Sequence, residues 1–351
     1  MMFHRRSGTL DAELTAMNEC MPHYYRITQG HGQGAELLMN AEAAFMQGNF
    51  SDAQILLEQT YSTIASNGQH NISLCCDFLA ARLSLFQEGV TFVKNPEVKR
   101  KELLSLHNMM WLNIFDSTYA YYYALIRMPE KIPALFKDHM LSTVSFLSPC
   151  RPMMEMIENQ VFLSQKMYAK VIGRSETLLP FCEKMHYELV SLHVQIQTAS
   201  AYAMLGKHHD ARQLLQKALG HAMPDGFLIP FVENYTYIKD VLGSINSITP
   251  EPFTDRILSL GSVYEQHCLR LSSRNSRPEI LNMLNSREAE IAALITDRLS
   301  NREIAERLFL SEGTVKQYVN QIYSKLMING DTRTKRKQLA ELISSINKGL
   351  T

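Results

Sequence analysis

Apolar residues recur along most of the chain at the spacing of amphipathic helices. Alternating segments rich in Val, Ile and Thr are largely absent, and so are Asn-Gly hairpin signals between them. Glycines and prolines fall between the helical blocks rather than inside them. The pattern therefore predicts an all-α fold.

Two stretches, residues 41–66 and 199–226, share one spacing of small and apolar residues. In each, a glycine is followed five residues later by an alanine and four residues after that by a leucine. The glycine ends one helix, the alanine lets the next helix approach closely, and the leucine fills the layer behind it. Weaker turns of this kind occur at 127–132 and 165–171, where the glycine is missing. The matching positions are Gly48, Ala53 and Leu57 in the first stretch, and Gly206, Ala211 and Leu215 in the second.

These helical hairpins resemble tetratricopeptide repeats, the second stretch more closely than the first. Such units cannot bury their apolar faces alone, so they stack into a curved solenoid. We expect an N-terminal lead-in over residues 1–32 and a sensor or interaction solenoid over 33–269. Residues 270–281 are rich in Ser, Arg and Asn and are expected to form an exposed linker. A compact domain is expected over 282–351.

The charge of the chain is distributed unevenly. Lys plus Arg and Asp plus Glu both number 35, so the formal net charge is zero, which excludes a uniformly polybasic coat and an acidic disordered tail. From Arg270 to the end there are 14 basic against 9 acidic residues, and the remainder has 21 against 26. A basic C-terminal end suggests an anionic partner for that end.

The chain offers no recognisable catalytic or metal-binding motif. Its six cysteines include no CxxC pair and are interpreted as small buried hydrophobes. Without a nucleophile elbow, a metal-ligand pair or a phosphate loop, we predict neither enzyme activity nor a cofactor or metal. Apolar patches are far shorter than the ~20 residues of a membrane span. No signal peptide is evident, so a cytoplasmic protein without membrane association is expected.

Residues 284–328 contain three helix starts in close succession. Asn285 with Glu288 and Ser300 with Glu303 have the spacing of capping boxes, and Ser311 caps a third helix. The connection between the second and third helices is very short, which is the arrangement of a helix-turn-helix. The expected helices cover 286–297, 301–308 and a longer stretch from 312.

The third of these helices has two contrasting faces. One arc is apolar and predicted to be buried, formed by Val315, Val319, Ile322 and Leu326. The opposite side is polar without any acidic residue, formed by Lys316, Gln317, Asn320 and Ser324. Lysine reaches phosphate or guanine, and Asn and Gln pair with adenine, so this face suits the major groove of DNA.

This block resembles the LuxR/FixJ/GerE-type helix-turn-helix family. The resemblance implies a four-helix domain that binds double-stranded promoter DNA as a homodimer. It implies base-reading roles for Lys316, Gln317 and Asn320. For Ser311, Thr314 and Lys325 it implies backbone contacts or support. The matching residues are Leu284, Arg287-Glu288, Leu299-Ser300-Asn301, Glu303-Ile304-Ala305, Leu308, Ser311-Glu312, Thr314-Val315-Lys316, Val319, Ile322 and Lys325-Leu326.

The sequence departs from this family after Leu326. The family usually has glycine there, whereas this chain has Met327 and reaches Asn329-Gly330 later. The following basic loop, DTRTKRKQ, either touches phosphates or is the solvated start of a fourth helix over about 336–347. That helix carries four apolar residues that serve either as a dimer seam or as packing within the domain: Leu339, Leu342, Ile343 and Ile346.

The two parts together resemble the C-terminal portion of the MalT-like (LAL) regulators, which place a tetratricopeptide-like sensor before this domain. The ATPase of those regulators has no phosphate-loop counterpart here, so the chain is either a short regulator or a fragment of a longer one. A transcriptional regulator with a small-molecule or protein effector, and with RNA polymerase as a candidate partner, is the first hypothesis. A scaffold whose helix-turn-helix has lost DNA binding is the alternative. Tyr119, Tyr122 and Tyr123 either line a ligand groove or belong to the solenoid core.

Overall fold

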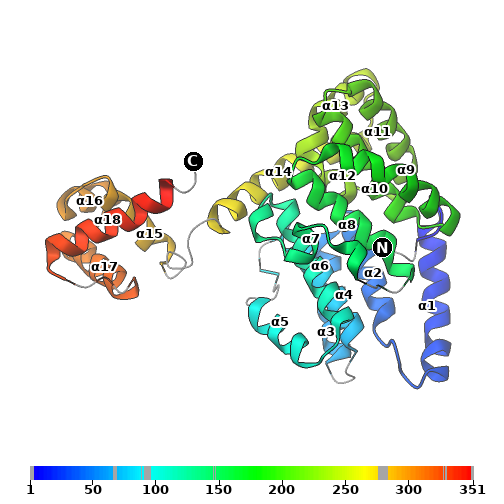
Figure 1. The fold of residues 1–351 in the computed structure, drawn as a ribbon, viewed down its shortest axis with the longest axis horizontal. Helices are drawn as coiled ribbons and strands as arrows, with labels where there is room; N and C mark the ends of the chain where they lie inside the picture. Colours follow the sequence, from blue (N-terminus) through cyan, green and yellow to red (C-terminus); the bar gives the residue numbers. More distant parts are fainter. Residues whose placement is uncertain are drawn as a thin grey trace. The chain divides into compact units, whose positions relative to one another are not determined.

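The computed structural model describes residues 4–65, 69–87, 89–90, 96–144, 146, 148–275, 284–326, 328 and 330–348. Every regular element in these ranges is a helix, as Figure 1 shows, so the all-α prediction is confirmed. Residue contacts divide the chain into two compact units, Met1–Arg270 and Leu271–Thr351. None of the described helices combines the length and the apolarity that a membrane crossing requires.

The first unit consists of helical hairpins packed side by side. Within the hairpins, α2 contacts α3, α8 contacts α9, and α10 contacts α11, while α2, α4, α6, α8 and α10 contact one another in that order. This succession is a solenoid. Its principal helices are α2 (Ala35–Met46), α3 (Phe50–Ile64), α4 (His70–Leu83), α5 (Pro96–Ser105), α6 (Met109–Leu125), α7 (Ala134–Lys137), α8 (Arg151–Ser164), α9 (Tyr168–Met185), α10 (Glu188–Met204), α11 (His208–Ala222), α12 (Ile229–Glu233), α13 (Tyr235–Ile248) and α14 (Pro252–Asn275).

The turns between hairpin helices lie where the glycine spacing predicts them. Gly48 and Gly206 have φ angles of 81° and 74°, a left-handed conformation that glycine adopts without a steric penalty. At the two degenerate turns, Arg127 (φ 58°) and Lys166 (φ 61°) take the left-handed position instead. The alanines and leucines that follow the two glycines are buried, as expected from the spacing.

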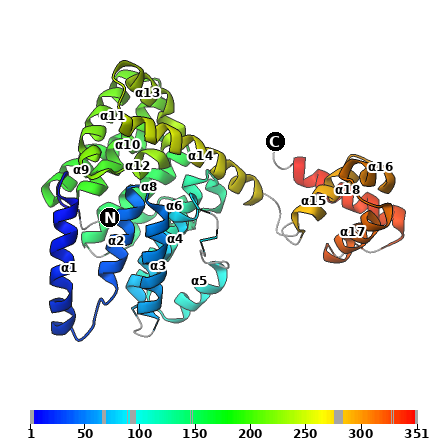
Figure 2. The ribbon, with the colours of Figure 1, turned by 180° about the vertical axis from the view of Figure 1, so that it is seen from behind.

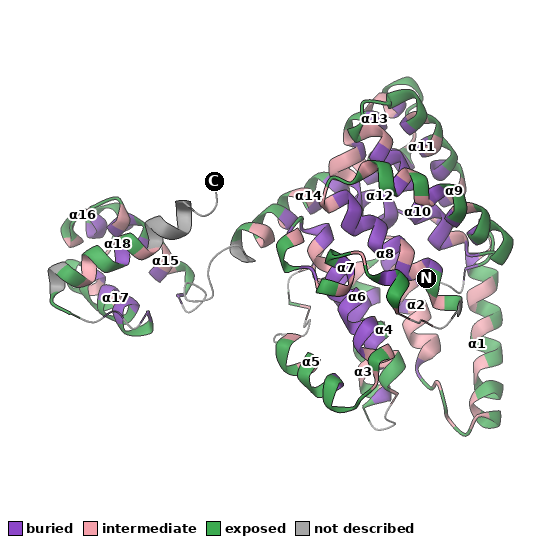
Figure 3. Cartoon of the chain, in the orientation of Figure 1, coloured by how far each residue is buried: buried purple, intermediate pink, exposed green. Residues whose placement is uncertain are grey.

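The solenoid curls until its late helices meet its early ones. Helix α12 contacts α2, and the Leu228 backbone N–H donates to the Met46 carbonyl over 2.9 Å. Close to this junction, Arg82 of α4 pairs with Glu233 of α12 inside the core. Figure 3 shows α6, α8 and α10 of this unit as mostly buried. The arginine, at 1% exposure, has its charge compensated entirely within the protein.

Residues 4–10, here called the N-terminal strap, bind to a turn more than two hundred residues away. The Asp225 carboxylate accepts hydrogen bonds from the Gly8 N–H (2.6 Å) and the Leu10 N–H (3.0 Å). His4 is buried, with Nδ1 2.8 Å from Glu13 Oε2 and Nε2 3.3 Å from Asp225 Oδ2. Helix α1 (Leu10–Ile27) follows the strap and lies beside α2 (Figure 2). The segment expected as a lead-in is therefore an ordered part of this unit.

The first residues of the predicted linker over 270–281 are helical. Helix α14 continues to Asn275, because one face of the helix is anchored by buried residues. That anchoring face includes Ile257, Tyr264 and Cys268, all buried. Residues 276–281 lie outside the described residues.

Helix α14 passes α13 at a glycine. A Cβ atom on Gly261 would lie 2.2 Å from Cδ2 of the Tyr235 ring, so Gly261→Ala forces the ring to move. We expect this substitution to destabilise the solenoid by about 1–3 kcal/mol. Urea unfolding followed by the fluorescence of Trp111, the single tryptophan of the chain, measures this unit alone.

The matched control for this prediction is Gly243→Ala in α13. A Cβ atom there meets nothing within 4 Å, so the change is expected to be neutral or stabilising by up to about 1 kcal/mol. Equal losses for the two variants would contradict the steric explanation.

From residue 284 onward, the described residues of the second unit form four helices around one core. They are α15 (Ser286–Thr296), α16 (Asn301–Leu308), α17 (Glu312–Lys325) and α18 (Thr332–Lys348). Helix α18 begins at Thr332 rather than at 336, because the Asp331 carboxylate accepts a hydrogen bond from the Thr334 N–H over 2.8 Å. The basic stretch is therefore mostly the beginning of this helix. The core contains Ile291, Ile304, Val315, Ile322 and Leu339.

Candidate nucleic-acid interface

Three side-chain caps fix where the helices of the C-terminal unit begin. Asn285 and Glu288 form the predicted capping box, with reciprocal hydrogen bonds of 2.8 and 2.7 Å. Ser300 and Glu303 form the second box. Ser311 Oγ accepts the N–H of Thr314 over 3.0 Å and caps α17. The three predicted helix starts are confirmed.

Helix α17 is held by one face and leaves the other open. Its apolar arc is buried against α15 and α16, as the periodicity predicts; this arc is Val315, Val319, Ile322 and Leu326. Lys316, Gln317 and Asn320 are exposed, and so is Ser324. The buried arc fixes the rotation of the helix, so these four polar side chains share one outward face.

The entry to α17 is shaped by two hydroxyl side chains. Ser311 Oγ and Thr314 Oγ1 lie 2.7 Å apart, and both residues belong to the first turn of the helix or its cap. A Cβ atom on Gly313 would meet nothing closer than Ser311 Oγ at 3.7 Å. The first turn therefore presents free backbone N–H groups beside an open surface, an arrangement that attracts anions.

Lys325 is bound within its own domain. Its Nζ lies 2.7 Å from Glu288 Oε2, and the carboxylate side chain is 1% exposed. Burial acts to raise the pKa of Glu288, but the hydrogen bonds from Lys325 and from the Asn285 N–H outweigh it, so this pKa is lowered. The ion pair connects the end of α17 to the start of α15, which makes Lys325 a support for the orientation of α17.

Helix α18 packs against its own domain through part of its predicted dimer seam. Leu339 is fully buried in the domain core, and Leu342 is half-buried against that core. Of the two alternatives, Leu339 fits packing within the domain, because α15 packs against the face of α18 that carries it. The side chains of Ile343 and Ile346 lie outside the described residues. Arg336 is also held locally, donating to Asn301 Oδ1 over 3.0 Å.

The region that carries this geometry matches a known family. Residues 282–336 match the family model described as "Bacterial regulatory proteins, luxR family". The C-terminal unit is a LuxR-family helix-turn-helix domain. The resemblance found in its sequence motif is confirmed for this domain.

Similar curated proteins are bacterial regulators that share part of their length with this chain. Transcriptional regulatory protein LnrK of Bacillus subtilis is 33% identical over 110 residues, 31% of this chain and 49% of LnrK. Transcriptional regulatory protein DegU of Brevibacillus brevis is 45% identical over 53 residues, 15% of this chain and 22% of DegU. DevR/DosR of Mycobacterium tuberculosis, a DNA-binding transcriptional activator, is 35% identical over 57 residues, 16% and 26% of the two chains. The chain thus spans at most about half the length of these relatives.

Several features of the LuxR-family domain were not anticipated from its sequence. Arg287 donates through Nη2 to the Leu308 carbonyl over 2.7 Å and so ties α15 to the end of α16. Phe309, between α16 and α17, is left-handed (φ 53°) and 96% exposed. The sequence does not show that Glu288 is buried and Glu303 is exposed, since both glutamates occupy the same position of a capping box.

The two capping glutamates of the LuxR-family domain allow a matched stability test. Glu288→Gln removes the ion pair with Lys325 and is expected to destabilise the domain by about 1–3 kcal/mol near neutral pH. Because the pKa of Glu288 is lowered on folding, its contribution is present above the unfolded pKa of about 4.3 and is lost as the pH falls through the lower folded value. The difference between variant and wild type should therefore shrink below about pH 4.

Urea titrations at pH 7 and at lower pH, followed by the methyl NMR signals of Ile291 and Ile304, report this domain alone. Glu303→Gln is the control, because Glu303 has the same capping position but forms no ion pair with any lysine whose side chain the structure describes. Equal sensitivity of the two variants would assign the effect to capping rather than to Lys325.

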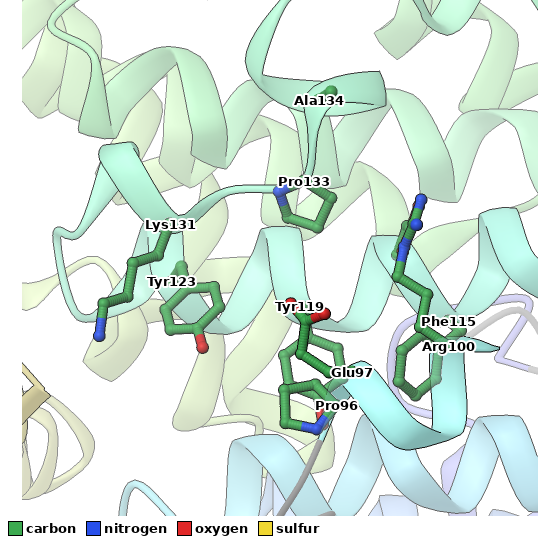
Figure 4. A pocket seen from close by; sticks show the side chains of 10 residues that line it. Pro96, Glu97, Arg100, Phe115, Tyr119, Tyr123, Lys131, Pro133 and Ala134 are labelled. Atoms are coloured by element: carbon green, nitrogen blue, oxygen red, sulfur yellow. The ribbon is translucent and has the colours of Figure 1, made fainter. Parts of the chain in front are cut away.

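The predicted tyrosine groove lies in the solenoid and is only partly present. Tyr119 and Tyr123 line a cavity of about 380 Å³, which Figure 4 shows from close by. Tyr119 is buried, Tyr122 is absent from the cavity wall, and burial raises the pKa of Tyr123. In the same wall, Arg100 makes two hydrogen bonds of 3.0 and 3.1 Å to the Asp116 carboxylate. In the described ranges, no group of three His, Cys, Asp or Glu side chains forms a metal site.

Proposed function

We propose that the protein is a transcriptional regulator that inserts α17 of its LuxR-family domain into the major groove of promoter DNA. The observation that carries the proposal is the exposed, non-acidic face of α17, held outward by a fully packed opposite arc. Lys316 would reach guanine or phosphate, and Gln317 and Asn320 would pair with adenine edges. The relatives named as transcriptional regulators support this role.

The first turn of α17 would bind the DNA backbone. Free N–H groups and the positive end of the helix dipole favour a phosphate there, and the hydroxyls of Ser311 and Thr314 are next to them. Lys325, which is paired with Glu288, would support the helix rather than contact phosphate directly.

The solenoid would supply regulation. As in the MalT-like arrangement that the sequence resembles, we propose that a small molecule or a protein partner binds the helical repeats. That binding would shift the population of DNA-binding conformations. The regulator would bind DNA as a homodimer, with RNA polymerase as a further partner, and would act in the cytoplasm, where it has access to the chromosome. No enzymatic step is part of this proposal.

The proposal is tested by selecting duplexes from a random pool with the full chain and repeating the binding at several salt concentrations. Enrichment of an inverted repeat, with affinity falling steeply as salt rises, is expected for a dimer that contacts phosphates. Enrichment of a single half-site would retain DNA reading but exclude the dimer. No enrichment at any salt concentration, by the full chain and by the separate segment 270–351, would overturn the proposal in favour of an interaction scaffold.

A further inference from the structure

Three neighbouring spaces, here together called the trough, lie beside α1, α2 and α4 of the solenoid. The first is an apolar cavity. The cavity has a volume of about 210 Å³ and lies between α2, α4, α6 and α8. Its wall includes Leu38, Leu79, Ile114 and Met154. An apolar cavity of this size holds a compact hydrocarbon group, and flexible methionines let the wall adapt to its shape.

A wider hollow lies next to the cavity, beside α1. Leu38, Glu42 and Cys75 line both spaces, so the two are direct neighbours. The hollow has a volume of about 610 Å³, and Met17 of α1 and Met39 of α2 continue its apolar wall. Together the two spaces provide more volume than a single ring occupies, which favours a longer apolar group.

The other end of the trough is basic. A third hollow of about 470 Å³ shares Arg5 and Glu13 with the second and is lined in addition by Arg6 and His186. Among the described residues, neither arginine forms an ion pair with a carboxylate. The Glu13 carboxylate, by contrast, already accepts hydrogen bonds from the Arg5 N–H and the Thr9 hydroxyl, both 3.0 Å long, and faces His4. The side chains at this end of the trough therefore carry a net positive charge.

Helix α1 covers the trough incompletely. All of its residues are described, and only Leu10 is buried, while Leu14, Met17 and Met21 on one face stay half-exposed. Figure 3 shows α1 as largely exposed and partly covered beside the buried inner helices. A hydrogen bond of 3.0 Å from Asn40 to Asn18 holds the middle of α1 to α2. An apolar ligand in the trough would bury the half-exposed face of α1, which gives binding a hydrophobic driving force.

We propose that this trough binds a small anionic amphiphile, with its hydrocarbon chain in the apolar cavity and its anionic head group at Arg5 and Arg6. A cationic head group is disfavoured, because Glu13 is already hydrogen-bonded and Glu42 lies 3.9 Å from the buried Arg82 guanidinium. The role of this ligand as the effector of a regulator rests on the proposed function. Its binding to the trough can be measured without DNA.

Cys75 provides a direct reporter for ligand in the trough. The residue is exposed and lines both the cavity and the hollow, so a reagent can reach its thiol when the trough is empty. Cys20, on α1, is also exposed but does not line the trough. With the full chain and N-ethylmaleimide, we expect dodecanoate below its micellar concentration to slow modification of Cys75 at least about fivefold, measured by peptide mass spectrometry. The modification rate of Cys20 in the same sample should stay unchanged.

Two comparisons make the test specific for the head group. Arg6→Glu should raise the dodecanoate concentration needed for half-maximal protection about tenfold, whereas Arg256→Glu, an exposed site on α14, should not change it. Dodecyltrimethylammonium, with the same chain and the opposite charge, should protect Cys75 poorly. No protection by dodecanoate, equal protection by the cationic amphiphile, or no effect of Arg6→Glu would each overturn the proposal. Because the readout is independent of DNA, its failure is distinguishable from a failure of DNA binding.

Discussion

Replacing Glu233 by alanine is expected to destabilise the solenoid by about 3–5 kcal/mol, because it removes the hydrogen-bonded counter-ion of a buried guanidinium and leaves only Glu42, 3.9 Å away. Arg82 donates from Nε to Glu233 Oε1 over 2.7 Å and from Nη2 to Oε2 over 3.0 Å. Tyr121 donates its hydroxyl to the same Oε2 over 2.9 Å. The rings of Phe45 and Phe78 lie over the guanidinium and exclude water from it. Little solvent is therefore available to replace the lost carboxylate.

The double variant Arg82→Met with Glu233→Leu separates this effect from simple loss of contacts. It removes both charges, so the loss of stability should be much smaller than for Glu233→Ala, although the Tyr121 hydroxyl loses its acceptor. Urea unfolding followed by Trp111 fluorescence measures all three proteins, since Trp111 lies in α6 of the solenoid. A loss under about 1 kcal/mol for Glu233→Ala would show that water reaches Arg82.

Replacing Lys316 and Asn320 together by alanine is expected to reduce the affinity for the selected duplex by at least about 30-fold. Each side chain that pairs with a base edge contributes about 1–3 kcal/mol of discrimination. The two residues lie one helical turn apart on the exposed face of α17, so they would read neighbouring bases. Neither packs in the domain core, so the helix content should stay unchanged. Competition with a scrambled duplex distinguishes lost selectivity from lost phosphate contacts.

The control for the α17 variant is Lys217→Ala on α11, which removes one positive charge from an exposed site of the solenoid. Its affinity for the selected duplex should equal that of the wild type at moderate salt, because separated surface charges are screened there. If the Lys316→Ala, Asn320→Ala protein keeps full selectivity with circular dichroism unchanged, the assignment of the base-reading face is wrong.

Local rules of helix formation account for what could be predicted from the sequence. The capping residues and the apolar arc of α17 are short-range signals, and the structure confirms both. The glycine–alanine–leucine spacing of the hairpins is also local, and it located the turns even at Arg127 and Lys166, where glycine is missing. The base-reading roles of Lys316, Gln317 and Asn320 remain a prediction, since exposure alone does not show what a side chain contacts.

The features that could not be predicted depend on contacts between residues that are far apart in the sequence. Periodicity shows that Leu339 lies on an apolar face, but not whether that face meets its own domain or a second chain. The Arg82–Glu233 pair joins residues 151 positions apart, and no local pattern distinguishes such an arginine from a solvated one. The end of α14 could not be predicted for a related reason, because the composition of 270–275 is compatible with both a linker and a helix.

The N-terminal strap changes how the solenoid is expected to unfold. An open array of repeats gains stability mainly from nearest neighbours, so its terminal repeats fray first and independently. Here the Asp225 carboxylate joins the strap to the turn after α11, which makes the two regions neighbours in space. Local unfolding of either region therefore exposes the other region to solvent. Amides of α1 and of residues 221–228 should therefore exchange with solvent as one cooperative group. A deletion of the first ten residues should increase amide exchange most strongly at the turn around Asp225, more than two hundred residues later in the sequence.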